Sequence, residues 1–225
     1  MQNQENIDWH MARSHVYGLF GSLLSDQPTV ETIEPLMCPE AVDYFETMFT
    51  APDIGTRFKR LVDQYYSGKI SVEQVALDFE GLMRVPGAAY TYPFESTYRA
   101  RRKGEKSVKW GGLCGSQARD AERFYHSEGL EPRYDRIDFA DHIGAELAFM
   151  SHMCRKTAEA MQTEQMGVSE HLQAKQQEFA HNHLLTWVAD FSAELKAKAA
   201  TPFFRVVADL LAAFAKLEKE EPITQ

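Results

Sequence analysis

The sequence predicts an all-α protein. Apolar residues recur three and four positions apart through most of the 225 residues, which is the spacing of an amphipathic helix. Convincing period-two strands are absent, and proline and glycine punctuate the helical stretches. With 44% hydrophobic and 12% aromatic residues, the chain has enough apolar side chains for one large helical domain or two helical lobes.

Four helical segments are predicted in the N-terminal part. The first covers residues 8–24, the second follows Pro39, and the third ends at Ser67-Gly68. The fourth begins after Ser71, a residue type that caps helices, with Gln74 three positions later to complete a capping box. Pro86-Gly87 ends this segment.

Residues 86–112 differ from the rest of the chain, because aromatic residues alternate with prolines and glycines there. We expect a long aromatic loop, with at most one helical turn. Long loops in compact proteins carry function more often than other segments do. The aromatic residues of this stretch are Tyr90, Tyr92, Phe94, Tyr98 and Trp110.

The helical pattern resumes after the loop. Residues 114–127 read as a helix, and GLEPRYDR at 129–136 interrupts the pattern as a candidate hinge. Three further helices are expected at about 138–163, 168–190 and 203–219. The predicted organisation is an N-terminal helical part, 1–128, that includes the loop, then the hinge, then a C-terminal helical part, 137–225.

Charge and composition exclude several classes of function. The chain has 24 basic and 33 acidic residues, a net charge of −9, which suits a basic partner such as an arginine-containing peptide rather than nucleic acid. Three widely spaced cysteines without a CxxC indicate free thiols rather than disulfides or a structural zinc site. The polar start and the lack of a long apolar run predict a cytoplasmic protein with no stable membrane insertion.

Asp141-His142 precedes an apolar helix and raises the question of a site. Helix capping accounts for the acids if Asp138 is the N-cap and Asp141 lies at the third helical position. His142 and Glu146 are four residues apart and would share one helical face, where they could hold a metal ion. No third ligand occurs at a natural spacing, so no metal is predicted.

Other polar motifs favour structural roles. Phe179, His183, Trp187 and Phe191 follow one another at intervals of four, the spacing of a buried helical face, so His183 is interpreted as a packed histidine. Ser96 lacks the GxSxG setting of a hydrolase nucleophile. The basic run RARRK, 99–103, reads either as a solvated loop edge or as a contact for an acidic part of a partner.

Three stretches in this order resemble one family. They are YPFESTY at 92–98, DFADHIGAELAFM at 138–150, and FAHNHLLTWVADF at 179–191 followed by TPFFRVVADLLAAF. Together they resemble the TorD/DmsD family of redox-enzyme maturation chaperones, and the resemblance covers roughly residues 10–217. One departure is Asp138-Phe139-Ala140, where the family usually has an acid-proline pair before Asp-His.

The resemblance implies an all-helical cytoplasmic protein without catalytic activity. Such chaperones bind the twin-arginine signal peptide and the apo-form of the catalytic subunit of a molybdopterin oxidoreductase, assist cofactor insertion and delay export. It implies no cofactor beyond weak guanine-nucleotide binding in some members. It also leaves open a monomer or a domain-exchanged dimer, for which 129–136 is a suitable place.

The resemblance also assigns a peptide-binding surface. Asp141 would pair with an arginine, and aromatic side chains would pack on the apolar part of the peptide. Gly111 and Phe79 are added by their place around the loop. The full set is Phe79, Tyr92, Pro93, Phe94, Ser96, Tyr98, Gly111, Asp141 and His142.

Three other functions remain alternatives at this point. One is a helical metal-dependent hydrolase using His142, Glu146 and a distant histidine. The second is an assembly chaperone of a nitrate reductase that is not exported. The third is a helical adaptor whose aromatic loop is merely structural.

Overall fold

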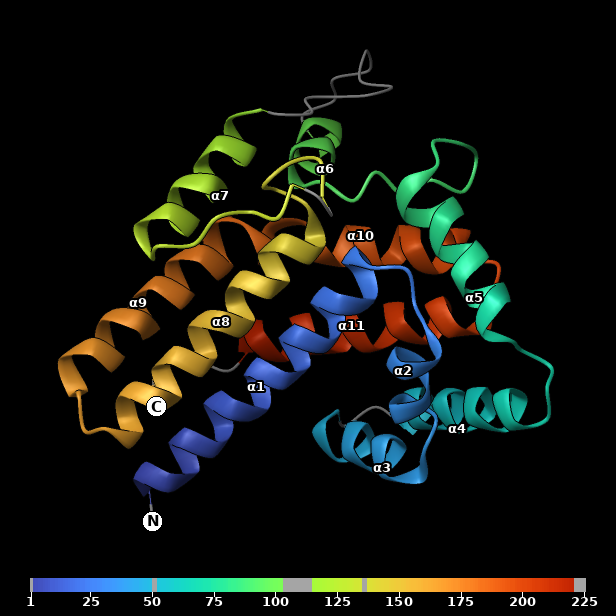
Figure 1. Ribbon diagram of the computed structural model, residues 1–225, viewed down its shortest axis with the longest axis horizontal. Coiled ribbons are helices and arrows are strands. Elements are labelled where there is room, and N and C mark those ends of the chain that lie inside the picture. The colour runs from blue at the N-terminus through green and yellow to red at the C-terminus, as the bar shows by residue number, and fades with distance from the viewer. Residues whose placement is uncertain (1, 50–51, 103–114, 135–136, 221–225) are drawn as a thin grey trace. The chain divides into compact units, whose positions relative to one another are not determined.

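The computed structural model describes residues 2–49, 52–102, 115–134 and 137–220, and over these the all-α fold class is confirmed (Figure 1). Within the described residues, extended pairing is limited to a single bridge between Phe94 and His142. None of the described helices is long and apolar enough to cross a membrane. The chain divides into two compact units, and each is discontinuous in sequence.

The first unit contains Met1–Ser25 and Pro93–Trp187. Its helices are α1 (Gln2–Ser25), α6 (Glu95–Arg102), α7 (Ser116–Ser127), α8 (Ile143–Gln162), α9 (Met166–Asn182) and the start of α10 (Leu184–Lys198). Helix α8 lies between α1 and α9 and packs along both (Figure 1). Its buried face includes Leu147, Met150 and Met153, none of which is accessible to solvent.

Two glycines allow α1 and α8 to approach closely. A Cβ atom on Gly144 would lie 1.8 Å from the Ser25 hydroxyl and 3.2 Å from the Gly21 carbonyl oxygen. A Cβ atom on Gly21 would lie 3.3 Å from the backbone nitrogen of Ala148. Side chains at these positions would push the helices apart, so the N-terminal end of α8 is held against α1 by close backbone contact.

The second unit contains Asp26–Tyr92 and Val188–Glu220. Its elements are α2 (Val30–Ile33), the 3₁₀ turn η1 (Glu34–Leu36), α3 (Pro39–Met48), α4 (Pro52–Tyr66), α5 (Val72–Phe79), the π-turn η2 (Glu80–Arg84), the rest of α10, and α11 (Pro202–Glu220). Ser71 and Gln74 form the predicted capping box of α5. Asp78, near the end of α5, accepts hydrogen bonds from the backbone N–H groups of Ala200 and Thr201, just before α11.

Two predicted helix boundaries are wrong. Helix α8 begins at Ile143 rather than near 138, because the backbone of Asp141 and Ile143 is bonded to residues 93–95, and its N-cap is His142. The helix expected at 168–190 is broken at His183, whose backbone (φ −121°, ψ −94°) is not helical. Asp138 is therefore not the N-cap of α8, and Asp141 lies before α8 rather than within it.

The predicted interruption of the helical pattern at 129–136 is observed in the described part of that stretch. Helix α7 ends at Ser127, and Gly129 has a positive φ of 71°, a conformation that glycine adopts without strain. The hinge role and the predicted division at this point stay predictions.

Candidate functional site

The aromatic stretch and the Asp-His stretch are joined backbone to backbone in the first unit. The N–H of Ile143 donates to the carbonyl oxygen of Pro93 (2.9 Å), and the N–H of Glu95 donates to the carbonyl oxygen of Asp141 (3.0 Å). Between these bonds lies the Phe94–His142 bridge. Two motifs about 45 residues apart in sequence therefore form one piece of structure.

Asp141 caps a helix that is distant in sequence. Its Oδ2 atom accepts a hydrogen bond from the backbone N–H of Ser96 (2.9 Å), in the first turn of α6. This is the bond that a local N-cap usually provides, supplied here from another segment. The side chain is fully buried, and within the described residues its Oδ1 atom has no hydrogen-bond partner. Burial raises the pKa of Asp141, and the neighbouring Glu95 carboxylate raises it further, against the hydrogen bond from the Ser96 N–H.

His142 begins α8 and is largely buried. Its Nδ1 atom accepts a hydrogen bond from the N–H of Gly144 (3.1 Å), which satisfies one of the free donors of the first turn. Its ring meets the ring of Phe94 edge to face, with centroids 5.4 Å apart. The imidazole of His142, which was considered as a metal ligand together with Glu146 although no metal was predicted, is thus engaged in capping and packing.

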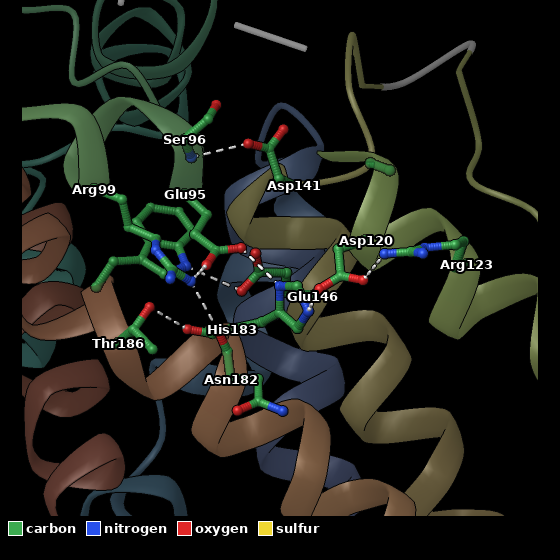
Figure 2. Close-up of polar contacts among 12 residues, drawn as sticks. Glu95, Ser96, Arg99, Asp120, Arg123, Asp141, Glu146, Asn182, His183 and Thr186 are labelled. Atoms are coloured by element: carbon green, nitrogen blue, oxygen red, sulfur yellow. Dashed lines mark hydrogen bonds and ion pairs between the residues drawn. The ribbon is translucent and has the colours of Figure 1, made fainter. Parts of the chain in front are cut away.

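A second polar group lies close by, the acid–histidine cluster of Glu95, Glu146 and His183 (Figure 2). All three residues are at most 1% exposed, and one potential ligand atom from each lies within 4.8 Å of the others. They come from α6, α8 and the break between α9 and α10. The Oε2 atom of Glu95 lies 2.8 Å from His183 Nδ1.

Three further side chains hold the acid–histidine cluster. Arg99 donates to Glu95 Oε1 (2.6 Å), and Trp187 Nε1 donates to Glu146 Oε2 (3.0 Å). On the other side of the imidazole, His183 Nε2 lies 3.5 Å from an oxygen of Asp120. Aromatic rings enclose the histidine: Phe179 stacks on it at 4.9 Å, and Phe124 meets it edge on.

Glu146 is the most perturbed acid of this region. Burial raises its pKa well above the usual value of 4.5, and the negative charges of Glu95 and Asp141 raise it further. The hydrogen bond from Trp187 and the positive charge of Arg99 oppose this shift in pKa without cancelling it. The carboxyl group is therefore favoured in its neutral form, and its Oε1 atom has no hydrogen-bond partner within the described residues.

The basic run forms part of a helix rather than a loop edge. Residues up to Arg102 belong to α6, so the stretch predicted to be a long loop contains a two-turn helix. Arg99 donates to the carbonyl oxygen of Asn182, and Arg102 donates to that of Thr186. Arg99 thus satisfies a carbonyl group at the end of α9, and Arg102 binds one in the first turn of α10, on the two sides of the break at His183.

The residues predicted for peptide binding are found in three places. Six belong to the first unit and have largely buried side chains, namely Pro93, Phe94, Ser96, Tyr98, Asp141 and His142. Tyr92, half-buried with a positive φ of 50°, and Phe79, fully buried, belong to the second unit. Gly111 lies outside the described residues. A role of these residues in binding a peptide stays a prediction.

Sequence reasoning missed Glu95 and His183 as partners of Glu146. Glu95 is the one acidic residue of the YPFESTY motif, and that carboxylate was the available signal. His183 was correctly predicted to be packed, together with Phe179, Trp187 and Phe191, which are all inaccessible to solvent. Its closeness to Glu95 depends on the break in the helix, which the sequence pattern did not indicate.

Comparison with known proteins places the chain in a family. The family model described as nitrate reductase delta subunit matches residues 39–193, which is more than half of the chain. The chain belongs to this family. The predicted membership among the TorD/DmsD chaperones is confirmed, since this family model covers the TorD proteins and several curated relatives carry that name.

The curated relatives match along almost their whole length. The chaperone protein TorD of Photobacterium profundum is 25% identical, with 96% of this chain and 96% of the relative covered. The corresponding protein of Colwellia psychrerythraea is 22% identical, with 96% and 94% covered, and that of Shewanella sp. (strain ANA-3) is 24% identical, with 96% of both covered. The chain is therefore a chaperone of this family and not an enzyme. Nothing in these comparisons favours the hydrolase alternative.

Proposed function

We propose that this chain is a cytoplasmic, system-specific chaperone for a molybdopterin oxidoreductase. It binds the twin-arginine signal peptide and the apo-form of the catalytic subunit, assists cofactor insertion and delays export. Membership in the chaperone family supports the general role. The net charge of −9 suits a ligand that carries paired arginines.

The observation that carries the proposal is the junction between the two motifs. The backbone bonds from Ile143 to Pro93 and from Glu95 to Asp141 hold the aromatic and the Asp-His stretches together. The resemblance assigns both stretches to one binding surface, and they do adjoin in the first unit. A peptide bound there would contact residues of both motifs at once.

Asp141 is the acid proposed to receive an arginine. One of its oxygens holds the N–H of Ser96, and the other has no partner within the described residues. A guanidinium group carries several N–H donors and binds carboxylate oxygens strongly, so an arginine would satisfy this remaining acceptor. Because Asp141 is fully buried, binding requires local opening of the segment around it.

One observation favours a second candidate function. The family model that matches this chain carries the description nitrate reductase delta subunit. A chaperone that assembles a nitrate reductase without an exported signal peptide would recognise the body of its client instead of a leader. The two candidates differ in ligand, so one binding experiment separates them.

The test is calorimetric titration of the purified chain with the twin-arginine leader peptides encoded in the same genome. Each peptide is paired with a control in which both arginines are replaced by lysine, which keeps the charge but loses the planar fork. We expect one leader to bind and its double-lysine control to bind at least about tenfold more weakly, or about 1.4 kcal/mol. Absence of binding to every leader, with a non-exported nitrate reductase co-purifying, would favour the second candidate.

The role of Asp141 is tested by Asp141→Asn. Asparagine keeps an oxygen for the N–H of Ser96, so helix α6 stays capped while the negative charge is lost. Asp78→Asn is the matched control, since Asp78 is also a buried capping aspartate but belongs to the second unit. Leader affinity should fall about tenfold in the first variant and stay unchanged in the second. Equal affinity in wild type and Asp141→Asn would show that Asp141 does not receive the arginine.

A further inference from the structure

We propose that Glu95, Glu146 and His183 form a binding site for one divalent transition-metal ion of the zinc class. Nothing in the family assignment or in the sequence pattern gives this chain such a site. The only pair considered from the sequence was His142 and Glu146, for which no metal was predicted. The argument rests on which atom of each side chain is already held and which atom faces the centre of the acid–histidine cluster.

Glu95 offers one oxygen. Its Oε1 atom is fixed by Arg99, which is itself held by the carbonyl oxygen of Asn182. Its Oε2 atom faces His183 Nδ1 at 2.8 Å. An ion bound at Oε2 would leave the Arg99 bond intact, and that bond would keep the carboxylate in its orientation.

Glu146 offers a buried carboxylate oxygen that has no hydrogen-bond partner within the described residues. Its Oε2 atom accepts the indole N–H of Trp187, while its Oε1 atom is buried without a partner in the described part of the chain. A fully buried acceptor without a partner costs stability of about 1–3 kcal/mol. A metal ion at Oε1 would remove that cost and would favour the ionised carboxylate.

His183 completes the set with an imidazole nitrogen. Its Nδ1 atom faces the two glutamates, and its Nε2 atom lies 3.5 Å from the Asp120 carboxylate. In protein metal sites the second nitrogen of a ligating histidine usually donates its proton to such a group, which fixes the tautomer and the ring. Phe179 and Phe124 restrict the ring further.

The three candidate ligands therefore share one arrangement. Each has one polar atom directed at an orienting partner and one directed at a common centre (Figure 2). Two carboxylate oxygens and one imidazole nitrogen suit a zinc-class ion, with ligand bonds of about 2.0–2.2 Å and one position left for water. The ligand atoms lie within 4.8 Å of one another, so small side-chain adjustments bring them to that distance.

Charge balance supports a cation. Two carboxyl groups of the acid–histidine cluster, with Asp141 nearby, face the single guanidinium of Arg99. A divalent ion would supply the missing positive charge, since buried charges in proteins are paired or coordinate metals.

The site would link α6, α8 and the break between α9 and α10, so its role is structural and not catalytic. Arg99 and Asp120 border the cluster with side chains that are 36% and 44% exposed, which gives an ion a route to the buried ligands. An ion that binds only the folded state stabilises it by an amount that grows with the logarithm of the ion concentration relative to Kd. It would therefore strengthen the unit that also carries the Asp141 junction.

The test uses the full chain, stripped with a chelator and titrated with Zn²⁺ by calorimetry and with Co²⁺ by visible absorption. We expect one equivalent per chain, a higher melting temperature, and a cobalt spectrum without a thiolate charge-transfer band. A thiolate band would place the ion on cysteines and overturn the proposal. Wild-type protein that takes up no stoichiometric ion would also overturn it.

Two variants locate the ion. Glu146→Gln keeps an oxygen for Trp187 and nearly the same volume, but its amide is a poor metal ligand, so stoichiometric binding should be lost. The double variant Glu128→Gln, His171→Asn removes a surface acid–histidine pair of the same unit, separated by 3.8 Å, and should bind like wild type. Retained binding in Glu146→Gln, with its circular dichroism unchanged, would place the ion elsewhere. If Glu146→Gln did not fold, Glu95→Gln would take its place. Loss of stoichiometric metal binding is expected for that variant as well.

Discussion

Asp78 and Asp141 perform the same structural task in different units, and they differ in how completely it is done. Each is a buried aspartate that accepts hydrogen bonds from the backbone N–H groups of a segment far away in sequence, which is the first turn of α6 for Asp141 and the residues just before α11 for Asp78. Asp78 accepts three hydrogen bonds of 2.7–3.1 Å, from the N–H groups of Ala200 and Thr201 and from the Thr201 hydroxyl, and both of its oxygens are used. The Asp141 carboxylate accepts a hydrogen bond at Oδ2 from the backbone N–H of Ser96. Its Oδ1 atom has no hydrogen-bond partner within the described residues.

The difference separates a structural aspartate from a functional candidate. Asp78 has all the donors that it needs, so helix capping explains it fully. Asp141 lies near Glu95, and burial together with that charge raises its pKa. An incompletely satisfied buried acid costs stability, and proteins tolerate such costs mainly where the group has another use. Asp141 and the acid–histidine cluster are therefore places where the described part of the first unit departs from optimal stability.

The largest expected effect comes from replacing the two aspartates by alanine. Asp78→Ala leaves three donors without their acceptor and should lower the free energy of unfolding by about 2–4 kcal/mol. Asp141→Ala removes one side-chain bond together with an unsatisfied oxygen, so its loss should be about 1 kcal/mol or less. Urea denaturation at pH 7 followed by circular dichroism measures both. Equal losses would show that the two caps are energetically alike and that the comparison fails.

A smaller effect, one that depends on pH, is expected for Glu146→Gln. The folded-state pKa of Glu146 lies well above its usual value of 4.5, so between that value and the raised pKa the folded state holds a proton that the unfolded state has lost. The stability of the wild type should therefore fall as the pH rises through this window. Glutamine does not titrate, so the variant should lack this part of the slope and should be the more stable protein at the alkaline end.

The measurement is urea denaturation at a series of pH values in the presence of a chelator. The difference between wild type and variant reports on Glu146, because the other acidic residues are present in both proteins. Glu146→Ala serves as the control for packing, since it removes the side chain and should be destabilised at every pH. Parallel curves for wild type and Glu146→Gln would show that the Glu146 carboxyl does not change its ionisation in this window.

Local features of the fold could be predicted from the sequence. Ser71 and Gln74 form the expected capping box because both partners lie within one turn of each other. The stripe Phe179, Trp187 and Phe191 is buried as its spacing predicts, since helical periodicity reports which face is apolar. The division of the chain into two helical parts at 129–136 stays a prediction.

The candidate site depended on contacts that are distant in sequence. Asp141 was expected to assist its own helix, but it caps α6, because the donor at Ser96 lies 45 residues away and no local pattern announces it. The break at His183 was hidden by a continuous apolar repeat and is supported by Arg99 and Arg102 from α6. Sequence reasoning thus found the motifs but could not find the polar partners that hold them.

The smallest expected effect is that of Ser96→Ala. The backbone N–H of Ser96 makes the bond to Asp141, whereas its buried hydroxyl has no hydrogen-bond partner within the described residues. Alanine keeps the N–H and removes the unsatisfied hydroxyl, so the free energy of unfolding should change by less than about 0.5 kcal/mol. Calorimetry with the leader peptide then reports on the hydroxyl alone. Weaker binding at unchanged stability would assign the Ser96 hydroxyl to the peptide, as the family resemblance implies. Unchanged binding would show that the Ser96 hydroxyl does not contact the peptide, and that Ser96 contributes only its backbone N–H, which binds Asp141.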